Sequence, residues 1–171
     1  MVGGTDGSCD DVKDPPPHLE GLEPDNAITY GDWRHPEFLD LCDRHKGGVK
    51  NDGYPWLLGV VNGCFDLMHL GHVNLTQQAV DFEHGKGHIF LVALLNTDAS
   101  VGRLKGLHRP IIPLPARMWT LAMLRGVMGV AGFDEDTPAE ALARLKPDFL
   151  FKGEEYRGTD IPGVEHCGEV V

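Results

Sequence analysis

A short apolar run that ends in a glycine turn and a pair of histidines constrains this chain more than any other feature. Residues 56–61 (WLLGVV) have the character of a buried strand, and residues 62–72 (NGCFDLMHLGH) follow at once. Apolar residues spaced i, i+4 and i+7 then predict an amphipathic helix after His72. A strand that turns directly into a helix points backbone amides beyond the sheet, where open α/β folds bind phosphate. His69 and His72 would face the same point.

The other apolar runs predict an α/β, Rossmann-like, three-layer fold with a parallel sheet of about five strands. Residues 88–95 are almost continuously apolar, as expected of a parallel strand covered on both faces. Further strands are expected at 127–133, 148–151 and 169–171, with helices at 116–125 and up to Leu145, whereas 96–115 is expected to form loops. The segment Thr137-Pro138-Ala139-Glu140 matches a capping box with proline at the first helical position.

The N-terminal part of the chain differs from the rest in charge. The first 26 residues hold seven acidic side chains and one lysine, and so carry −6 of the net charge of −11. Because this stretch lacks the apolar content to offset its ordering entropy, residues 1–27 are predicted to be a disordered leader. Residues 28–55 are predicted to be a helical extension, with a short helix that ends at Gly47-Gly48. Residues 56–171 form the main predicted domain.

Composition disfavours several classes of protein. No apolar run approaches the length of a membrane span, and no basic region followed by an apolar stretch marks a secretory signal. The four cysteines are widely scattered, which favours free thiols in a reducing compartment. An acidic chain with no basic stripe is a poor nucleic-acid binder. We therefore expect a cytoplasmic protein with neither nucleic acid nor membrane as a partner.

Several motifs together resemble a known family. Residues 62–72 resemble the signature of the cytidylyltransferase-like nucleotidyltransferases, which join a nucleoside triphosphate to a phosphorylated small molecule and release pyrophosphate. The later segments 95–101 (LNTDASV), 103–106 (RLKG), 109–111 (RPI), 133–138 (FDEDTP), 146–148 (KPD) and 151–153 (FKG) resemble the adenylyltransferase half of bacterial ADP-heptose synthases. The resemblance covers roughly residues 57–171. It implies transfer of AMP from ATP to a sugar 1-phosphate, with D-glycero-D-manno-heptose 1-phosphate as the expected acceptor.

The resemblance assigns the chemistry to a few side chains. His69 and His72 would donate to oxygens of the α-phosphate, and Lys105 would be the third catalytic residue, because nucleotidyl transfer needs positioning and positive charge. Arg103 and Arg109 are the candidate phosphate clamps. The nucleotide-binding candidates are Asn62, Gly63, Cys64, Phe65, Asp66, Gly71, Asn96, Asp98, Arg117, Lys152 and Gly153.

Several of these candidates have an ordinary structural alternative. Asp66 could orient a histidine, reach Mg²⁺ through water or cap its own turn. Cys64 is expected to be a small buried residue and not a nucleophile. Asn96 and Asp98 follow a strand, so ribose contact and helix capping are both open. Lys105 and Arg117 could be ordinary exposed side chains. Gly71 is expected because a residue without a Cβ would let a phosphate approach closely.

The resemblance also implies partners and exposes one departure. Mg²⁺ is the expected cofactor, no protein-bound metal site is predicted, and a homodimer and a separate sugar kinase upstream are expected. The Ser-Thr-Thr-type motif that follows the last strand in the family is missing, because the sequence stops at 168–171 (GEVV). The sequence would then be a fragment, a shortened homologue or a chain that takes those contacts from elsewhere. A cytidylyltransferase acting on glycerol 3-phosphate, or on a similar alcohol phosphate, and a weakly catalytic nucleotide-binding module are the alternatives.

Overall fold

The chain folds as a parallel sheet between two layers of helices. The computed structural model describes residues 28–82, 85 and 87–171, so the predicted leader lies outside the described residues. In chain order the elements are β1 (Ile28–Tyr30), α1 (Pro36–His45), β2 (Trp56–Gly63), α2 (Leu70–Val80), β3 (His88–Asn96), α3 (Asp98–Lys105), α4 (Leu114–Ala122), β4 (Val127–Phe133), α5 (Ala139–Leu145), β5 (Phe149–Phe151), the 3₁₀ turns η2 (Glu154–Tyr156) and η3 (Val164–His166), and β6 (Glu169–Val170).

The strand order places the predicted site at a topological switch point. The six strands lie in the order β1-β4-β3-β2-β5-β6, and every pair is parallel. From β2 the chain proceeds to β3 and β4 on one side, and then crosses to β5 and β6 on the other side. Open α/β sheets bind ligands where the strand order reverses, at the carboxyl ends of the strands. That point is the carboxyl end of β2, between β3 and β5.

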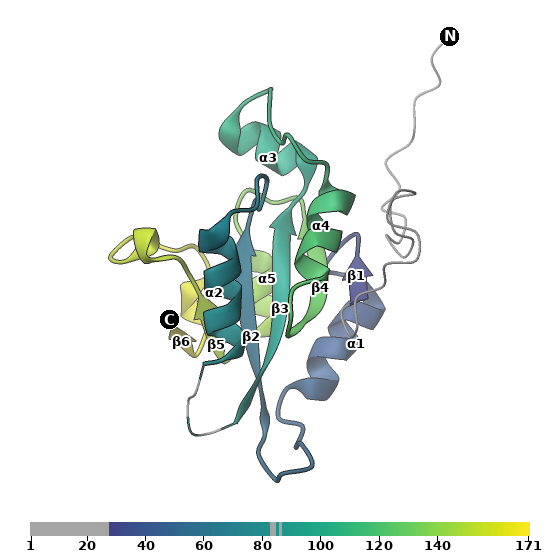
Figure 1. Cartoon of the computed structure of the whole chain (residues 1–171), viewed down its shortest axis with the longest axis vertical. Helices are drawn as coiled ribbons and strands as arrows, with labels where there is room; N and C mark the ends of the chain where they lie inside the picture. Colours follow the sequence, from purple (N-terminus) through teal and green to yellow (C-terminus); the bar gives the residue numbers. More distant parts are fainter. Residues whose placement is uncertain (1–27, 83–84, 86) are drawn as a thin grey trace.

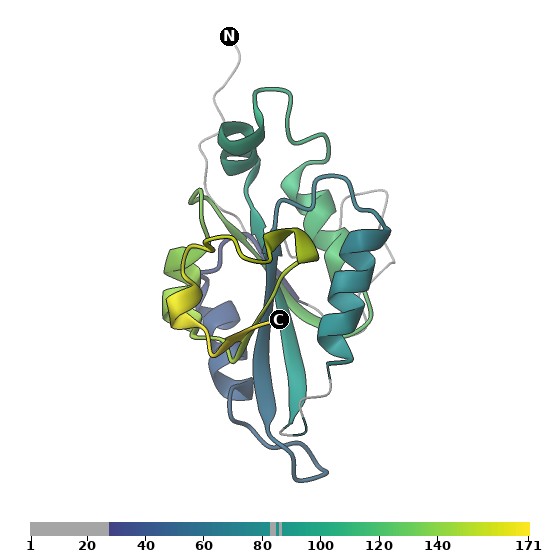
Figure 2. The same ribbon diagram turned by 90° about the vertical axis from the view of Figure 1, so that its left-hand side faces the viewer.

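Each face of the sheet has its own apolar core. Helices α1 and α5 pack on one face through Phe38, Leu41 and Leu142, and helices α2 and α4 pack on the other through Ala79 and Met118. Figure 2 shows the two helical layers on either side of the sheet. Helix α3 belongs to neither layer and stands beyond the carboxyl ends of the strands (Figure 1).

One strand and one α-helix were not predicted from the sequence. Strand β1 pairs with β4 through only three residues, too few to show a periodic pattern, so the segment expected to be a helical extension also adds a strand to the sheet. Helix α3 lies inside the stretch expected to be loop. Its composition, with Ser100, Val101 and Gly102, is a poor helix former. The helix is stabilised at its start because the Thr97 hydroxyl accepts from the Ser100 amide at 3.2 Å.

Three helix starts also differ from the prediction. Helix α2 begins at Leu70 and not after His72. Helix α4 begins at Leu114 and not at 116, because Pro115 fits within a first turn, where its missing N–H is not needed. The expected capping box at the start of α5 is wrong. The N-cap of α5 is Pro138, which has no side-chain cap, and Thr137 lies outside the helix.

Candidate functional site

The turn after β2 is held in an unusual backbone conformation. Phe65 has φ 48°, in the left-handed region that non-glycine residues rarely occupy. Its side chain is only 3% exposed, and its ring centroid lies 5.2 Å from that of His72. Packing of the ring therefore offsets the backbone strain and fixes the direction in which the chain enters α2. Strain of this kind concentrates at functional sites.

The two histidines cap helix α2 reciprocally. The Gly71 amide donates to His69 Nδ1 at 3.1 Å, and the His69 amide donates to His72 Nδ1 at 3.4 Å. Because each Nδ1 accepts a hydrogen bond, each neutral ring carries its proton on Nε2. The ring centroids lie only 3.9 Å apart. The chain thereby places two N–H donors together at a helix N-terminus, which is the arrangement that binds an anion.

Gly71 leaves room for the His69 ring, whereas the predicted reason for a glycine here was the close approach of a phosphate. A Cβ at this position would lie 2.9 Å from Cε1 and 3.0 Å from Nδ1 of His69. Any other residue would therefore push the His69 ring away from the amide that it caps. The predicted close approach of a phosphate is not needed to explain the glycine.

Asp66 anchors a loop. Its carboxylate is buried and accepts from the amides of Ile111 at 2.6 Å and Ile112 at 2.9 Å, and it pairs with the Arg109 guanidinium. Burial alone would raise the pKa of Asp66, but these hydrogen bonds and Arg109 hold it below its ordinary value. These contacts hold the carboxylate against the loop at residues 109–112 and not against a histidine. It fixes Arg109 at the edge of the site.

Arg117 lies inside the protein, so the prediction that it contacts the nucleotide directly is wrong. Its side chain has no exposed surface. It donates to the carbonyl oxygens of Ile112 and Asn96, both at 2.9 Å, and to that of Cys64. It also pairs with Asp98 at 2.6 Å, so Asp98 is likewise engaged. Arg117 ties the carboxyl ends of β2 and β3 to the start of α4.

The two basic residues predicted in one loop have different surroundings. Both lie on helix α3 and not in a loop. Arg103 pairs with Asp136 at 2.8 Å and also bonds Asp134, and it does not line the cleft described below, so its role as a phosphate clamp stays a prediction. Lys105 is exposed, and it makes no hydrogen bond or ion pair with the described residues.

Asn96 and Cys64 join the ends of neighbouring strands. Asn96 is 4% exposed, and its Nδ2 donates to Ser100 Oγ at 3.0 Å. The Cys64 thiol donates to Asn96 Oδ1 at 3.7 Å. Cys64 is partly exposed and not fully buried as predicted, and its thiol contacts the Asn96 amide.

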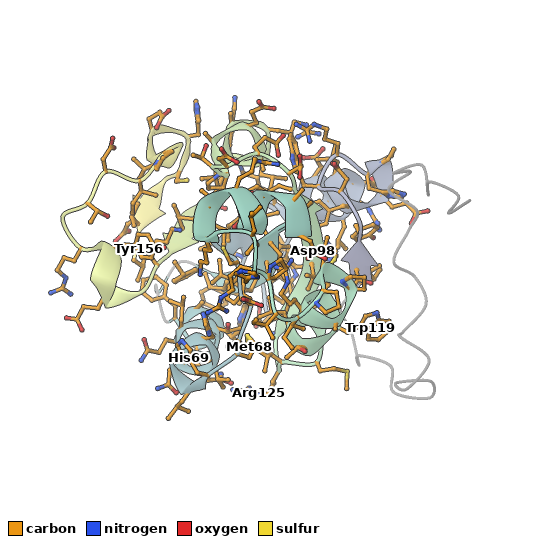
Figure 3. The ribbon with its side chains drawn as sticks, turned by 90° about the horizontal axis from the view of Figure 1, so that it is seen from above. Met68, His69, Asp98, Trp119, Arg125 and Tyr156 are labelled. Atoms are coloured by element: carbon orange, nitrogen blue, oxygen red, sulfur yellow. The ribbon has the colours of Figure 1, made fainter. Side chains whose placement is uncertain are left out.

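These elements surround a cleft of about 630 Å³ at the carboxyl edge of the sheet. Figure 3 looks down on this edge and shows His69 at the start of α2, Asp98 at the start of α3 and Tyr156 on η2. The predicted residues that line the cleft are Asn62, Gly63, Cys64, Phe65, Asp66, His69, His72, Asn96, Lys105, Arg109, Lys152 and Gly153. Those that do not line it are Gly71, Asp98, Arg103 and Arg117.

Sequence reasoning missed several lining residues. Thr137 and Pro138 enter from the loop before α5, and Tyr156 and Asp160 enter from the segment after β5. The available signal was their position just beyond strand ends. Lys152 lies at the same edge, with its Nζ 4.5 Å from the centre of the Tyr156 ring, a cation–π contact.

The cleft offers cations for phosphate and few carboxylates for a metal ion. Lys105, Arg109 and Lys152 line it, while the carboxylates of Asp66 and Asp136 are paired with arginines. No group of three or more metal-ligating side chains occurs in the part of the chain that the structure describes. No helix among the described residues has the length and apolar character that a membrane span requires.

Comparison with known proteins places this site in a family. Residues 60–164 match the family model described as cytidylyltransferase-like. A "Bifunctional protein HldE" of Nitratiruptor sp. is 42% identical over 128 residues, which is 75% of this chain and 25% of that protein. A protein of the same name from Chromohalobacter salexigens is 48% identical over 106 residues, which is 62% of this chain and 21% of that protein.

The chain therefore spans about a quarter of the length of these curated relatives. A solved structure, described as a lipopolysaccharide core biosynthesis protein from Thermoplasma volcanium, is 20% identical, with a TM-score of 0.46 over 55% of this chain and 71% of that one. The family model covers well over half of this chain, including the glycine turn, the histidine pair and the strand ends around them. The chain belongs to the cytidylyltransferase-like family of nucleotidyltransferases.

Proposed function

We propose that the cleft transfers AMP from ATP to a sugar 1-phosphate, with D-glycero-D-manno-heptose 1-phosphate as the acceptor, to give ADP-heptose and pyrophosphate. The observation that carries this proposal is the capped histidine pair at the start of α2. Both imidazoles accept a backbone N–H at Nδ1, so in the neutral ring the proton sits on Nε2, the type of donor that stabilises oxygens of an α-phosphate. The choice of acceptor follows the resemblance to ADP-heptose synthases and the similarity to the HldE proteins.

The proposed reaction is a single in-line displacement. An oxygen of the acceptor phosphate attacks the α-phosphorus of ATP, a new P–O bond forms, and the bond from the α-phosphorus to the bridging oxygen breaks as pyrophosphate leaves. His69 and His72 stabilise the charge on the non-bridging oxygens of the α-phosphate. Lys105, Arg109 and Lys152 neutralise the outer phosphates and the acceptor phosphate.

Mg²⁺ remains the proposed cofactor, and the donor set fits an ion carried by the nucleotide. Mg²⁺ is commonly bound through one or two carboxylates together with substrate phosphates. Asp66 and Asp136 are engaged by arginines, so Asp160 is the remaining carboxylate on the lining. When bound, the ion would neutralise charge on the triphosphate. A homodimer, a separate sugar kinase upstream and a cytoplasmic location stay predictions.

Pyrophosphate release tests the proposed function. The purified chain is supplied with Mg²⁺ and either ATP or CTP, against either heptose 1-phosphate or glycerol 3-phosphate. We expect pyrophosphate release only from the pair of ATP and heptose 1-phosphate. Release only with CTP and glycerol 3-phosphate would replace the proposed substrates but keep the reaction class. Nucleotide binding without turnover of any pair would favour a binding module.

A further inference from the structure

The cleft extends over both faces of the sheet. Leu58 and Val60 belong to the core under α1 and α5, whereas Val61 belongs to the core under α2 and α4. Because side chains alternate along a strand, Asn62 points to the α5 face. The histidines cap α2 on the opposite face. Asn62 therefore marks a second part of the cleft, across the sheet edge from the histidine pair.

Other lining residues share that face. Phe133 and Leu150 both belong to the core on the α5 side. Lys152 lies two residues after Leu150, so the alternation of side chains along a strand places it on the same face. We call this part of the cleft the α5-side lobe and define it by Asn62, Phe133, Thr137, Lys152, Asp160 and Ile161.

The Asn62 amide in this lobe lacks partners. Its Oδ1 is buried and accepts no hydrogen bond, and its nitrogen donates none to the described residues. The other amide at this edge, Asn96, is satisfied at both ends. Buried polar groups in folded proteins are nearly always paired, and an unmade hydrogen bond is costly. Because Asn62 lines the cleft, a ligand can satisfy this amide through its nitrogen, or through Oδ1 once the amide has turned.

The chemistry of the lobe favours a sugar. Phe133 and Ile161 supply an apolar wall, and Asn62, Thr137 and Asp160 supply neutral or acidic polar groups. A phosphate would need several cations, and Lys152 is the one that this lobe contains. A sugar ring presents a face of C–H groups together with hydroxyls that can both donate and accept, which suits an amide whose two ends are free.

We propose that the α5-side lobe holds a sugar ring and that the Asn62 amide, turning about its terminal torsion, hydrogen-bonds one of its hydroxyls. This inference rests on the proposed function. The hydroxyl comes either from the ribose of the nucleotide or from the acceptor sugar. Asn62 is then a specificity residue, because it distinguishes a substrate with that hydroxyl from one without it.

The test measures KM for each substrate in Asn62→Leu and Asn62→Asp. Asn51→Leu, an exposed asparagine in the hairpin before β2, is the matched control. Loss of one neutral hydrogen bond predicts a rise in KM of about tenfold for one substrate, with kcat unchanged. Asn62→Asp keeps an acceptor oxygen, so its KM should rise less than that of Asn62→Leu. The control should leave both KM values unchanged.

Deoxy substrates identify the source of the hydroxyl. If it is a ribose hydroxyl, 2′-deoxy-ATP or 3′-deoxy-ATP has a higher KM than ATP in the wild type, and this difference disappears in Asn62→Leu. If it belongs to the acceptor, the KM of heptose 1-phosphate rises in Asn62→Leu and that of ATP does not. Unchanged KM values for both substrates in folded Asn62→Leu would overturn the inference.

A calorimetric arm separates this inference from the proposed function. If the wild type shows no turnover, the proposed function fails, and dissociation constants are measured for ATP, the deoxy nucleotides and heptose 1-phosphate. Weaker binding of ATP or of heptose 1-phosphate to Asn62→Leu would still support the lobe as a sugar site. Equal binding of both to the wild type and to Asn62→Leu would overturn it.

Discussion

Replacing Arg117 by methionine tests how the site is held together. The guanidinium is buried and bonds three backbone carbonyl oxygens and Asp98. Hydrogen bonds from a charged donor contribute about 1.5–3 kcal/mol each, so the four give about 6–12 kcal/mol before dehydration is counted. Dehydration of the guanidinium costs several kcal/mol, which leaves an expected loss of about 3–5 kcal/mol for Arg117→Met. Methionine fills most of the volume but leaves the carbonyl oxygens without a donor.

Urea denaturation followed by circular dichroism measures this loss. Arg125→Met is the matched control, because Arg125 follows the same helix, and its side chain is 71% exposed and pairs with Asp81. We expect a change below about 1 kcal/mol for this exposed pair. Nucleotide binding by Arg117→Met should also weaken, because the ends of β2 and β3 lose their common anchor. A loss below about 1 kcal/mol for Arg117→Met would refute the role assigned to the buried guanidinium.

Four further predictions follow from single contacts. Gly71→Ala should lower kcat by about 10²-fold with little change in Tm, because the new Cβ displaces the His69 ring; unchanged kinetics would contradict this. Asp66→Asn should lower the free energy of unfolding by a constant amount above about pH 4, and by less below it. The pKa of Asp66 is lowered in the folded protein, so the stability that its carboxylate contributes is lost as the pH falls through that folded-state pKa. Urea titrations at several pH values measure this loss. Burial raises the pKa of Cys42 to about 12, so iodoacetamide at pH 8 should leave Cys42 unmodified in the folded protein and modify it in urea, as read by mass spectrometry. Lys146→Gly should stabilise the fold by about 0.5–1 kcal/mol, because Lys146 ends α5 with φ 47°; a lower urea midpoint would count against this.

The fold could be predicted where apolar patterns are long. The continuous run of β3 and the turn from β2 into α2 carry enough residues to show their type, and both were predicted close to their observed places. Strand β1 is too short to show a pattern, and it forms because β4 offers a free edge for pairing. Helix α3 depends on the Thr97 cap and on the bond from Asn96 to Ser100, which single-residue propensities do not register.

The sequence motif of the candidate site was predictable, but the contacts that its charged side chains make in the folded protein were not. The spacing of His69 and His72 was visible in the sequence, and so was the glycine between them. Which charged residues are already paired was not visible, because Arg103 meets Asp136, and Arg117 meets the strand ends, only after the chain has folded. The lobe on the α5 side also depends on strand alternation and on a loop that follows β5. Arg109 is also paired, with Asp66, but it lines the cleft, whereas Arg103 and Arg117 do not, and this difference in position appears only in the folded chain.

The most direct test of the central claim is the kcat of His69→Ala and His72→Ala for pyrophosphate release, with ATP binding measured by calorimetry on the same preparations. If the capped histidines stabilise the transition state, each substitution lowers kcat by about 10²–10³-fold, while the dissociation constant for ATP stays within about threefold of the wild type. Substitutions that leave kcat unchanged would contradict the account, and so would substitutions that abolish ATP binding without any specific effect on kcat.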